Sequence, residues 1–271
     1  MQKYALVTGA SSGMGLEFSI QLAGRGYGII VVSNRPEENI KAAQTIRASV
    51  DLHDDDGNGY VRVIDADLTE ADSARKVYDI VKQWNLTVEV LVSNAGMLLF
   101  SQLVNTDLTR LDKIINLHCN TPVKLIQLFG NDMKKRGEGY ILITSSSTAW
   151  MQYPTISHYG ATKAFLKNFS RSIWYELRRY GVGVTAVFPG AVDTPLYQLD
   201  DSKRRILRTL GIMMTPKKVA QSALSALFAR RYRCIPGVFN KLSIALCACI
   251  PSVLLLPLLK IPSIRRLLDS V

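Results

Sequence analysis

Tyr159 and Lys163 lie four residues apart in a segment with helical periodicity, so their side chains share one face of the expected helix. A tyrosine in water has a pKa of about 10, and acid–base chemistry near neutral pH requires a lower value. A nearby ammonium group favours the phenolate and so lowers that pKa. The pair therefore predicts a tyrosine that transfers a proton, assisted by the lysine.

The same spacing occurs a second time, at Tyr78 and Lys82, so the spacing alone is not specific. Ser146 precedes Tyr159 by thirteen residues and follows an expected strand, whereas Asp65 stands thirteen residues before Tyr78. Tyr159 also follows a strand end on the ligand side of the expected sheet, whereas Tyr78 lies in the middle of a crossover helix. We therefore expect the first pair to be catalytic and the second to be surface.

A glycine-rich turn follows the first expected strand, with the sequence Thr8-Gly9-Ala10-Ser11-Ser12-Gly13-Met14-Gly15. Glycines permit a tight turn and a close approach of the backbone to a ligand. The helix that follows offers free N–H groups and a positive dipole to a pyrophosphate. The turn predicts a dinucleotide site whose contacts are Gly9, Ser11, Ser12, Gly13, Met14 and Gly15.

The end of the second strand indicates which dinucleotide is bound. An acidic residue there would bind the ribose hydroxyls of NAD, but the chain has Asn34 and Arg35, with no acid before Glu37. Arg35 can pair with a 2′-phosphate, so we expect NADPH to be preferred over NADH; the alternative is a solvated loop residue. Asp67 and Leu68 are expected beside the adenine, although Asp67 is equally suited to capping a helix.

The elements that position these residues alternate between strand and helix six times. The pattern predicts an α/β fold, a doubly wound parallel sheet of six to seven strands with helices on both faces and ligands at the strand carboxyl ends. The expected strands are 4–7, 28–33, 60–64, 88–92, 140–144 and 182–188, and the expected helices are 15–25, 36–49, 70–83, 107–135, 158–180 and 216–230.

Over roughly residues 3–235 the chain resembles the classical short-chain dehydrogenases/reductases, whose domain we expect to span residues 1–240. The matching pieces are the glycine turn, Asp67, Asn94-Ala95-Gly96, Asn116, Ser146, Tyr159, Lys163, and Pro189-Gly190 with Thr194. The resemblance implies an NAD(P)-dependent oxidoreductase. It also implies cofactor contacts from Asn94, Ala95, Gly96, Tyr159, Lys163, Pro189, Gly190, Val192 and Thr194.

The resemblance further implies a catalytic tetrad of Asn116, Ser146, Tyr159 and Lys163. In it Tyr159 protonates the developing alkoxide, and Ser146 hydrogen-bonds the same oxygen. Lys163 lowers the tyrosine pKa and binds the nicotinamide ribose, while Asn116 holds a water that feeds the proton relay. The departures are small: Ser93 stands where many members have an asparagine, and Ala149 replaces a frequent glycine.

The substrate is expected to be a small apolar carbonyl compound, with sterols, long-chain acyl ketones and small aldehydes all open. A lid is expected at about residues 195–215. Its apolar candidates are Leu196, Tyr197, Leu199, Ile206, Leu210, Ile212 and Met213, facing Trp150, Met151 and Tyr153. The alternative function is a non-catalytic dinucleotide-binding module that docks on a membrane.

Charge is concentrated at the carboxyl end, because residues 202–271 hold 13 of the 33 basic residues and one of the 22 acids. Within them, residues 242–259 carry no formal charge and include Pro251 and Pro257. Such a basic, apolar extension (241–271) favours peripheral membrane contact through residues 230–271. The alternative is packing against the protein's own body or a second subunit, in a homodimer or homotetramer.

Composition sets the remaining expectations. With 48% hydrophobic and 20% charged residues the chain is typical of a globular protein rather than a disordered one. Four cysteines form no regular framework, and three histidines are not spaced with them, so neither disulfides nor a metal site is expected. The opening residues lead directly into a strand, which predicts a cytoplasmic protein. If its tail docks, the protein is expected to be peripheral at the inner face of a membrane. No nucleic-acid partner is expected.

Overall fold

The main sheet of the protein has seven parallel strands in the order β3-β2-β1-β4-β5-β6-β9. This computed structural model describes residues 2–50, 60–151, 154–194, 205, 207–209, 211–249 and 257. The strands are β1 (Lys3–Thr8), β2 (Gly28–Ser33), β3 (Val61–Asp65), β4 (Thr87–Ser93), β5 (Gly139–Thr144), β6 (Val182–Val187) and β9 (Arg233–Cys234). The strand order reverses between β1 and β4, and such a switch point is where doubly wound folds bind ligands.

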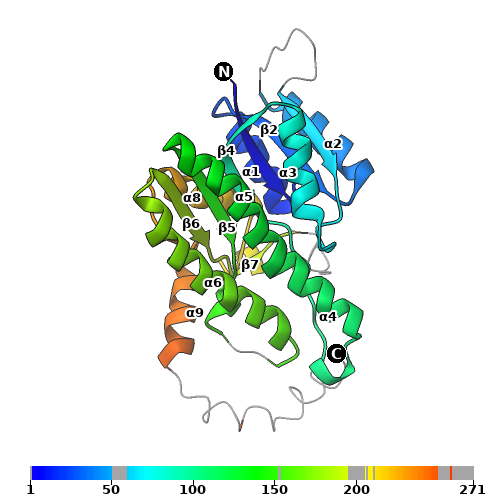
Figure 1. Cartoon of the computed structure of the whole chain (residues 1–271). Coiled ribbons are helices and arrows are strands. Elements are labelled where there is room, and N and C mark those ends of the chain that lie inside the picture. Colours follow the sequence, from blue (N-terminus) through cyan, green and yellow to red (C-terminus); the bar gives the residue numbers. More distant parts are fainter. Residues whose placement is uncertain are drawn as a thin grey trace.

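Helices cover both faces of the sheet (Figure 1). On one face lie α1 (Gly13–Ala23), α2 (Pro36–Ala48) and α8 (Pro216–Phe228); on the other lie α3 (Ser73–Gln83), α5 (Thr121–Arg136) and α6 (Ser157–Arg178). Alternate residues of β1 enter the two cores, Leu6 on one side and Val7 on the other. The doubly wound α/β fold expected from the sequence is therefore confirmed.

The long helix expected over residues 107–135 is interrupted. It consists of α4 (Leu108–Ile115), a π-helical turn (Asn116–Asn120) and α5. Pro122 provides a physical reason, because it lacks the N–H that would bond to the carbonyl of residue 118, and its ring would crowd that carbonyl. Single π turns inside α-helices occur frequently at functional sites.

The last described helix, α9 (Val238–Cys249), is joined to the body by the buried residue Asn240. Its amide nitrogen donates to the carbonyl oxygens of Phe188 and Pro236, at 2.9 and 3.2 Å. The domain boundary expected after residue 240 therefore falls inside a helix whose first turn packs on the end of β6. Within the described residues, no helix is both long and apolar enough to cross a membrane.

Candidate active site

The glycine turn lies at the switch point, and at Gly9 and Gly15 it is packed too closely for a side chain. A Cβ at Gly15 would lie 2.0 Å from the carbonyl oxygen of Gly9, and one at Gly9 would lie 2.9 Å from the Cα of Ala95. Gly9 and Gly13 also adopt positive φ angles of 65° and 55°. The three glycines thus let the turn fold back onto the start of α1 and the end of β4.

Thr8 and Asn94 join the ends of the two central strands. The Thr8 hydroxyl accepts from the backbone N–H groups of Asn94 and Ala95, at 2.9 and 3.0 Å, and donates to the carbonyl of Val92. The Asn94 amide in turn donates to the Thr8 carbonyl at 3.1 Å. The resemblance assigned Asn94 to the cofactor. The structure shows that its side chain also holds the end of β4 against the end of β1.

The expected catalytic serine and tyrosine lie at one cavity of about 260 Å³. Ser146 follows β5 and begins a short 3₁₀ turn (Ser147–Ala149), where its hydroxyl accepts from the Thr148 N–H at 3.2 Å. Tyr159 comes from the first turns of α6. The other lining residues are Leu98, Phe100, Ser147, Thr148, Pro154, Ile156, Gly190 and Ala191. The cavity thus joins two hydroxyl groups to apolar walls.

Lys163 lies one turn after Tyr159 on α6 and is almost completely buried, with 4% of its surface exposed. Its ammonium nitrogen donates to the carbonyl of Thr144 at 3.1 Å and lies 5.5 Å from the centre of the Tyr159 ring. Burial lowers the pKa of Lys163 to about 8. Ser145 supports this position, because its hydroxyl donates to the Lys163 carbonyl at 2.8 Å.

The fourth expected catalytic residue, Asn116, is not brought to these groups by any contact of its side chain in the described part of the chain. Its amide oxygen accepts a hydrogen bond from the side chain of Asn120 at 2.7 Å. His118, two residues further on, faces the site instead and lies edge-on to Tyr159, with ring centres 5.6 Å apart. The role that the resemblance gave to Asn116 therefore stays a prediction.

The residues that follow β2 are those expected to select the cofactor, and that expectation stays a prediction. Asn34 and Arg35 are exposed, and the Arg35 guanidinium has one weak ion pair, 4.0 Å from Glu38. Sequence reasoning missed Asn39, a buried amide that bonds the Ser33 hydroxyl at 2.6 Å and the Asp65 carboxylate at 2.7 Å. Asn39 thereby engages the carboxylate of Asp65 at the end of the neighbouring strand β3, while Arg35 faces solvent.

Asp67 and Leu68 follow β3. The Asp67 carboxylate accepts from the Thr69 N–H at 2.9 Å, which is the capping arrangement that the sequence left open. Leu68 is buried, and its carbonyl accepts from the hydroxyl of Thr121 at 2.9 Å. Their assignment to the adenine pocket stays a prediction.

The turn after β6 faces the glycine turn. A Cβ on Gly13 would lie 3.1 Å from the Cγ2 of Thr194, which is itself buried. Pro189 accepts from the Ser147 N–H at 2.9 Å, and Gly190 lines the cavity. Val192 belongs to β7 (Ala191–Val192), which pairs with β8 (Met213–Met214).

Much of the expected lid lies outside the described residues, as do Leu196, Tyr197, Leu199, Ile206, Leu210 and Tyr153. Met213 is buried in β8. Trp150 packs on Phe188, with ring centres 4.4 Å apart, and Met151 is also buried; neither is among the described residues that line the cavity. The expectation that they form its wall is not supported by these contacts.

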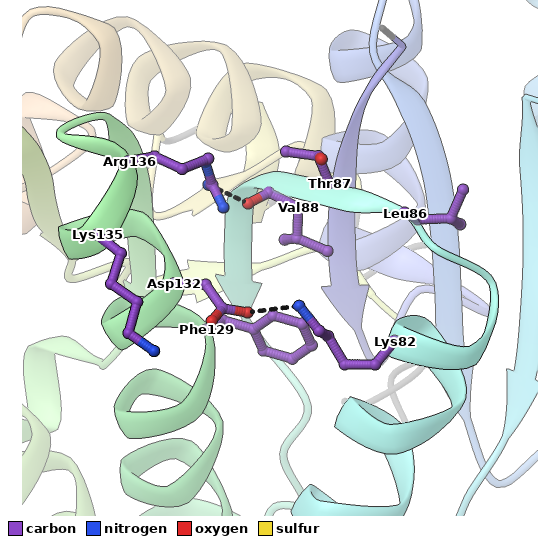
Figure 2. Close-up of a pocket in the computed structure, with 8 residues that line it drawn as sticks. All are labelled: Lys82, Leu86, Thr87, Val88, Phe129, Asp132, Lys135 and Arg136. Carbon is purple, nitrogen blue, oxygen red and sulfur yellow. Dashed lines mark hydrogen bonds and ion pairs between the residues drawn. The ribbon is translucent and has the colours of Figure 1, made fainter.

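The second tyrosine–lysine pair lies at the opposite end of the sheet. Lys82 pairs with Asp132 at 3.4 Å beside a separate cavity that includes Thr87 and Val88 at the start of β4 (Figure 2). The Tyr78 hydroxyl bonds Asp132 at 3.0 Å, and burial together with Asp132 raises the pKa of Tyr78. This is the reverse of what an acid–base tyrosine needs. Lys82 is exposed as expected, but Tyr78 is partly buried against Phe129.

These residues fit a dinucleotide. The glycine turn forms a cradle that a Cβ would fill, it precedes α1, and the first turn of that helix contains no acidic residue. Free N–H groups at such a helix start favour a pyrophosphate. A parallel sheet with this turn at its switch point, and with Ser146, Tyr159 and Lys163 beside it, defines a Rossmann-type dinucleotide-binding protein that has an acid–base group.

The comparison with known proteins identifies the family. A sequence model described as short chain dehydrogenase matches residues 3–205, so the chain belongs to the short-chain dehydrogenase/reductase family, whose members are NAD(P)-dependent oxidoreductases. It is 34% identical over 204 residues to 17-beta-hydroxysteroid dehydrogenase type 3 of Homo sapiens, covering 72% of this chain and 61% of that protein.

A second relative is the very-long-chain 3-oxoacyl-CoA reductase of Pyricularia oryzae, 30% identical over 225 residues. That match covers 82% of this chain and 63% of the relative, so the chain spans less than two thirds of both proteins. A solved 7beta-hydroxysteroid dehydrogenase superposes with a TM-score of 0.78 at 22% identity, covering 90% of each chain. A dehydrogenase from Sphingobium yanoikuyae in complex with NADPH gives 0.74 at 24%, covering 93% of this chain and 97% of that one.

Proposed function

We propose that the protein is an NADPH-dependent reductase that adds a hydride to the carbonyl group of an apolar substrate. The observation that carries this proposal is the cavity lined by Ser146 and Tyr159. It places two hydroxyl donors next to Gly190, on the turn expected to face the cofactor, while Leu98, Phe100 and Ile156 supply apolar walls. A binding module without chemistry has no use for this combination.

In the proposed mechanism, bound NADPH supplies the hydride. Ser146 donates a hydrogen bond to the carbonyl oxygen and holds it in position, which is worth most where charge develops on that oxygen. Tyr159 transfers its phenolic proton to the same oxygen. The positive charge of Lys163 favours the phenolate that this transfer leaves behind.

The proposed substrate class is a sterol or a long-chain acyl ketone. Two relatives support it by name, one a hydroxysteroid dehydrogenase and the other a very-long-chain 3-oxoacyl-CoA reductase. The cavity also supports it, because Phe100 at its wall is 53% exposed and its ring offers an apolar surface to such a substrate. The preference for NADPH is supported by Arg35 and by the engagement of Asp65 with Asn39.

The test is NADPH oxidation by the purified full chain against a 17-ketosteroid, a long-chain 3-oxoacyl-CoA and a small aldehyde. We expect turnover with one of the two large apolar ketones and weaker turnover with the aldehyde. Tight NADPH binding without turnover of any compound would instead support the non-catalytic module.

We also propose that the carboxyl-terminal region docks the protein on an anionic membrane surface. Helix α9 exposes Val238, Leu242 and Leu246, which are spaced four residues apart and form one apolar stripe, whereas Ile244 on its other side is buried. Exposed basic residues lie near this stripe in the sequence; they are Arg230, Arg231, Arg233 and Lys241. Apolar insertion together with basic residues is the pattern of peripheral membrane binding.

Co-sedimentation with vesicles tests this docking. The double variant Leu242→Asp/Leu246→Asp should lose binding to anionic vesicles, whereas Ile40→Asp, an exposed apolar residue on α2, should bind like the parent. Equal sedimentation of the parent with neutral and anionic vesicles, or none with either, contradicts the proposal. A loss of mass by light scattering in the double variant alone would instead indicate a second copy of the chain.

A further inference from the structure

His118 connects three parts of the active site, although no sequence motif pointed to it. The residue lies in the π-helical turn, and only 1% of its surface is exposed. Its Nε2 atom accepts from the backbone N–H of Met97, at 3.0 Å, in the turn that follows Asn94-Ala95-Gly96. Its Nδ1 atom lies 2.9 Å from the hydroxyl oxygen of Thr162 on α6.

The direction of these hydrogen bonds follows from the partners. A backbone N–H can only donate, so Nε2 must be the unprotonated nitrogen and Nδ1 must carry the proton of the neutral ring. Nδ1 therefore donates to the Thr162 hydroxyl, which itself donates to the Tyr159 carbonyl at 2.8 Å. A directional chain thus runs from the Met97 backbone through His118 to the helical turn that holds Tyr159.

The surroundings of the ring keep it neutral and in place. Burial, followed by the positive charge of Lys163, lowers the pKa of His118 well below its usual value. Gly96 permits the close approach, because a Cβ at that position would lie 3.1 Å from Nε2. The edge of the ring also packs against Tyr159. Asn116 makes none of these contacts; its side chain bonds Asn120.

We propose that His118 is a positioning residue for the proton-transfer step, fixing Tyr159 relative to the turn after β4. This proposal rests on the proposed reductase activity, and the role it gives to His118 is separate from the water-holding role that the family resemblance gave to Asn116. It requires both hydrogen bonds of the ring, one to Met97 and one to Thr162. A positional error of about 1 Å in a reacting group can cost on the order of 100-fold in rate.

Three variants separate the two hydrogen bonds. His118→Phe keeps a planar ring against Tyr159 but loses both bonds. His118→Gln can still accept from Met97 through its amide oxygen, and Thr162→Val removes only the second bond. We expect kcat to fall on the order of 100-fold in His118→Phe, and less in the other two, with the dissociation constant of NADPH unchanged in all three.

His158→Gln is the matched control, since His158 lies on α6 beside Tyr159 but bonds the Leu111 carbonyl at 3.2 Å. We expect its kcat to match the parent. If His118→Phe does not fold, His118→Gln and Thr162→Val decide the question. Parent-like kcat in a folded His118→Phe variant, or in both of the others, would overturn the proposal. A parent enzyme that reduces no carbonyl compound would instead count against the reductase function itself.

Discussion

The ammonium nitrogen of Lys163 lies 5.5 Å from the ring centre of Tyr159, one helical turn away on α6, and is held there by the carbonyl of Thr144 at the end of β5. The charge that favours the phenolate is therefore anchored to the sheet as well as to the helix. Since the lysine is buried, its effect on the tyrosine is little weakened by solvent.

Replacing Tyr159 by Phe should abolish carbonyl reduction and leave NADPH binding near the parent value, because the ring stays but the transferable proton is lost. Ser146→Ala should lower kcat on the order of 100-fold or more, through loss of one hydrogen bond to the reacting oxygen. Steady-state kinetics and NADPH titration measure both. The control is Tyr78→Phe, which loses the bond to Asp132 at a stability cost of about 1 kcal/mol and should retain full activity.

The reduction rate should fall as the pH rises through about 8, the pKa to which burial lowers Lys163. Below that pH the lysine is protonated and its charge favours the phenolate; above it the charge is lost. The pH profile of kcat/KM for NADPH reports groups of the free enzyme. In Lys163→Arg the guanidinium keeps its proton, so the decline should move to higher pH. A profile that stays flat above pH 8 would contradict this assignment.

Arg35→Ala should raise the dissociation constant of NADPH roughly tenfold, which corresponds to a hydrogen bond to a charged group at an exposed position. NADH affinity should hardly change, because NADH lacks the 2′-phosphate. Lys41→Ala, which removes an exposed charge from α2, the helix that Arg35 directly precedes, is the control for non-specific electrostatic effects. Equal kcat/KM for the two cofactors in the parent would show that Arg35 does not select NADPH.

Gly15→Ala should destabilise the protein and weaken dinucleotide binding, since the new Cβ would lie 2.0 Å from the Gly9 carbonyl oxygen. Gly24→Ala, at the other end of α1, should stabilise by about 0.4–1 kcal/mol, because its φ of −63° suits alanine and the nearest atom is 3.5 Å away. Thermal unfolding measures both changes. A Gly15→Ala protein that melts like the parent would show that the turn can relax.

The strands of the fold and the glycine turn of the site were predictable because their signals are local. Strands that are apolar on both faces and a glycine turn before a helix are visible within ten residues. The cluster at Ser146, Tyr159 and Lys163 required the strand ends to meet at one edge of the sheet, which the parallel topology ensures. The spacing of Tyr78 and Lys82 was equally local, and only the position of the sheet separates the two pairs.

His118 and Asn39 could not be predicted, because the partners that define their roles are distant in the sequence. Met97 lies 21 residues from His118, and Asp65 lies 26 residues from Asn39. One signal was available: Pro122 inside a helical pattern indicated a local change of geometry just before it. His118 lies in the π-helical turn that precedes this proline, and its ring packs edge-on against Tyr159.

Asn240 has a consequence for how the protein unfolds. Its hydrogen bond to the Phe188 carbonyl joins the first turn of α9 to the end of β6, so this turn should open together with the sheet in one cooperative unit. Amide hydrogen exchange in that turn should accordingly be as slow as in the central strands, although the helix lies near the carboxyl end. A ligand that stabilises the sheet would then raise the free energy of exchange in this turn by the same amount, which links the cofactor site to the start of α9 with no change in the native backbone conformation.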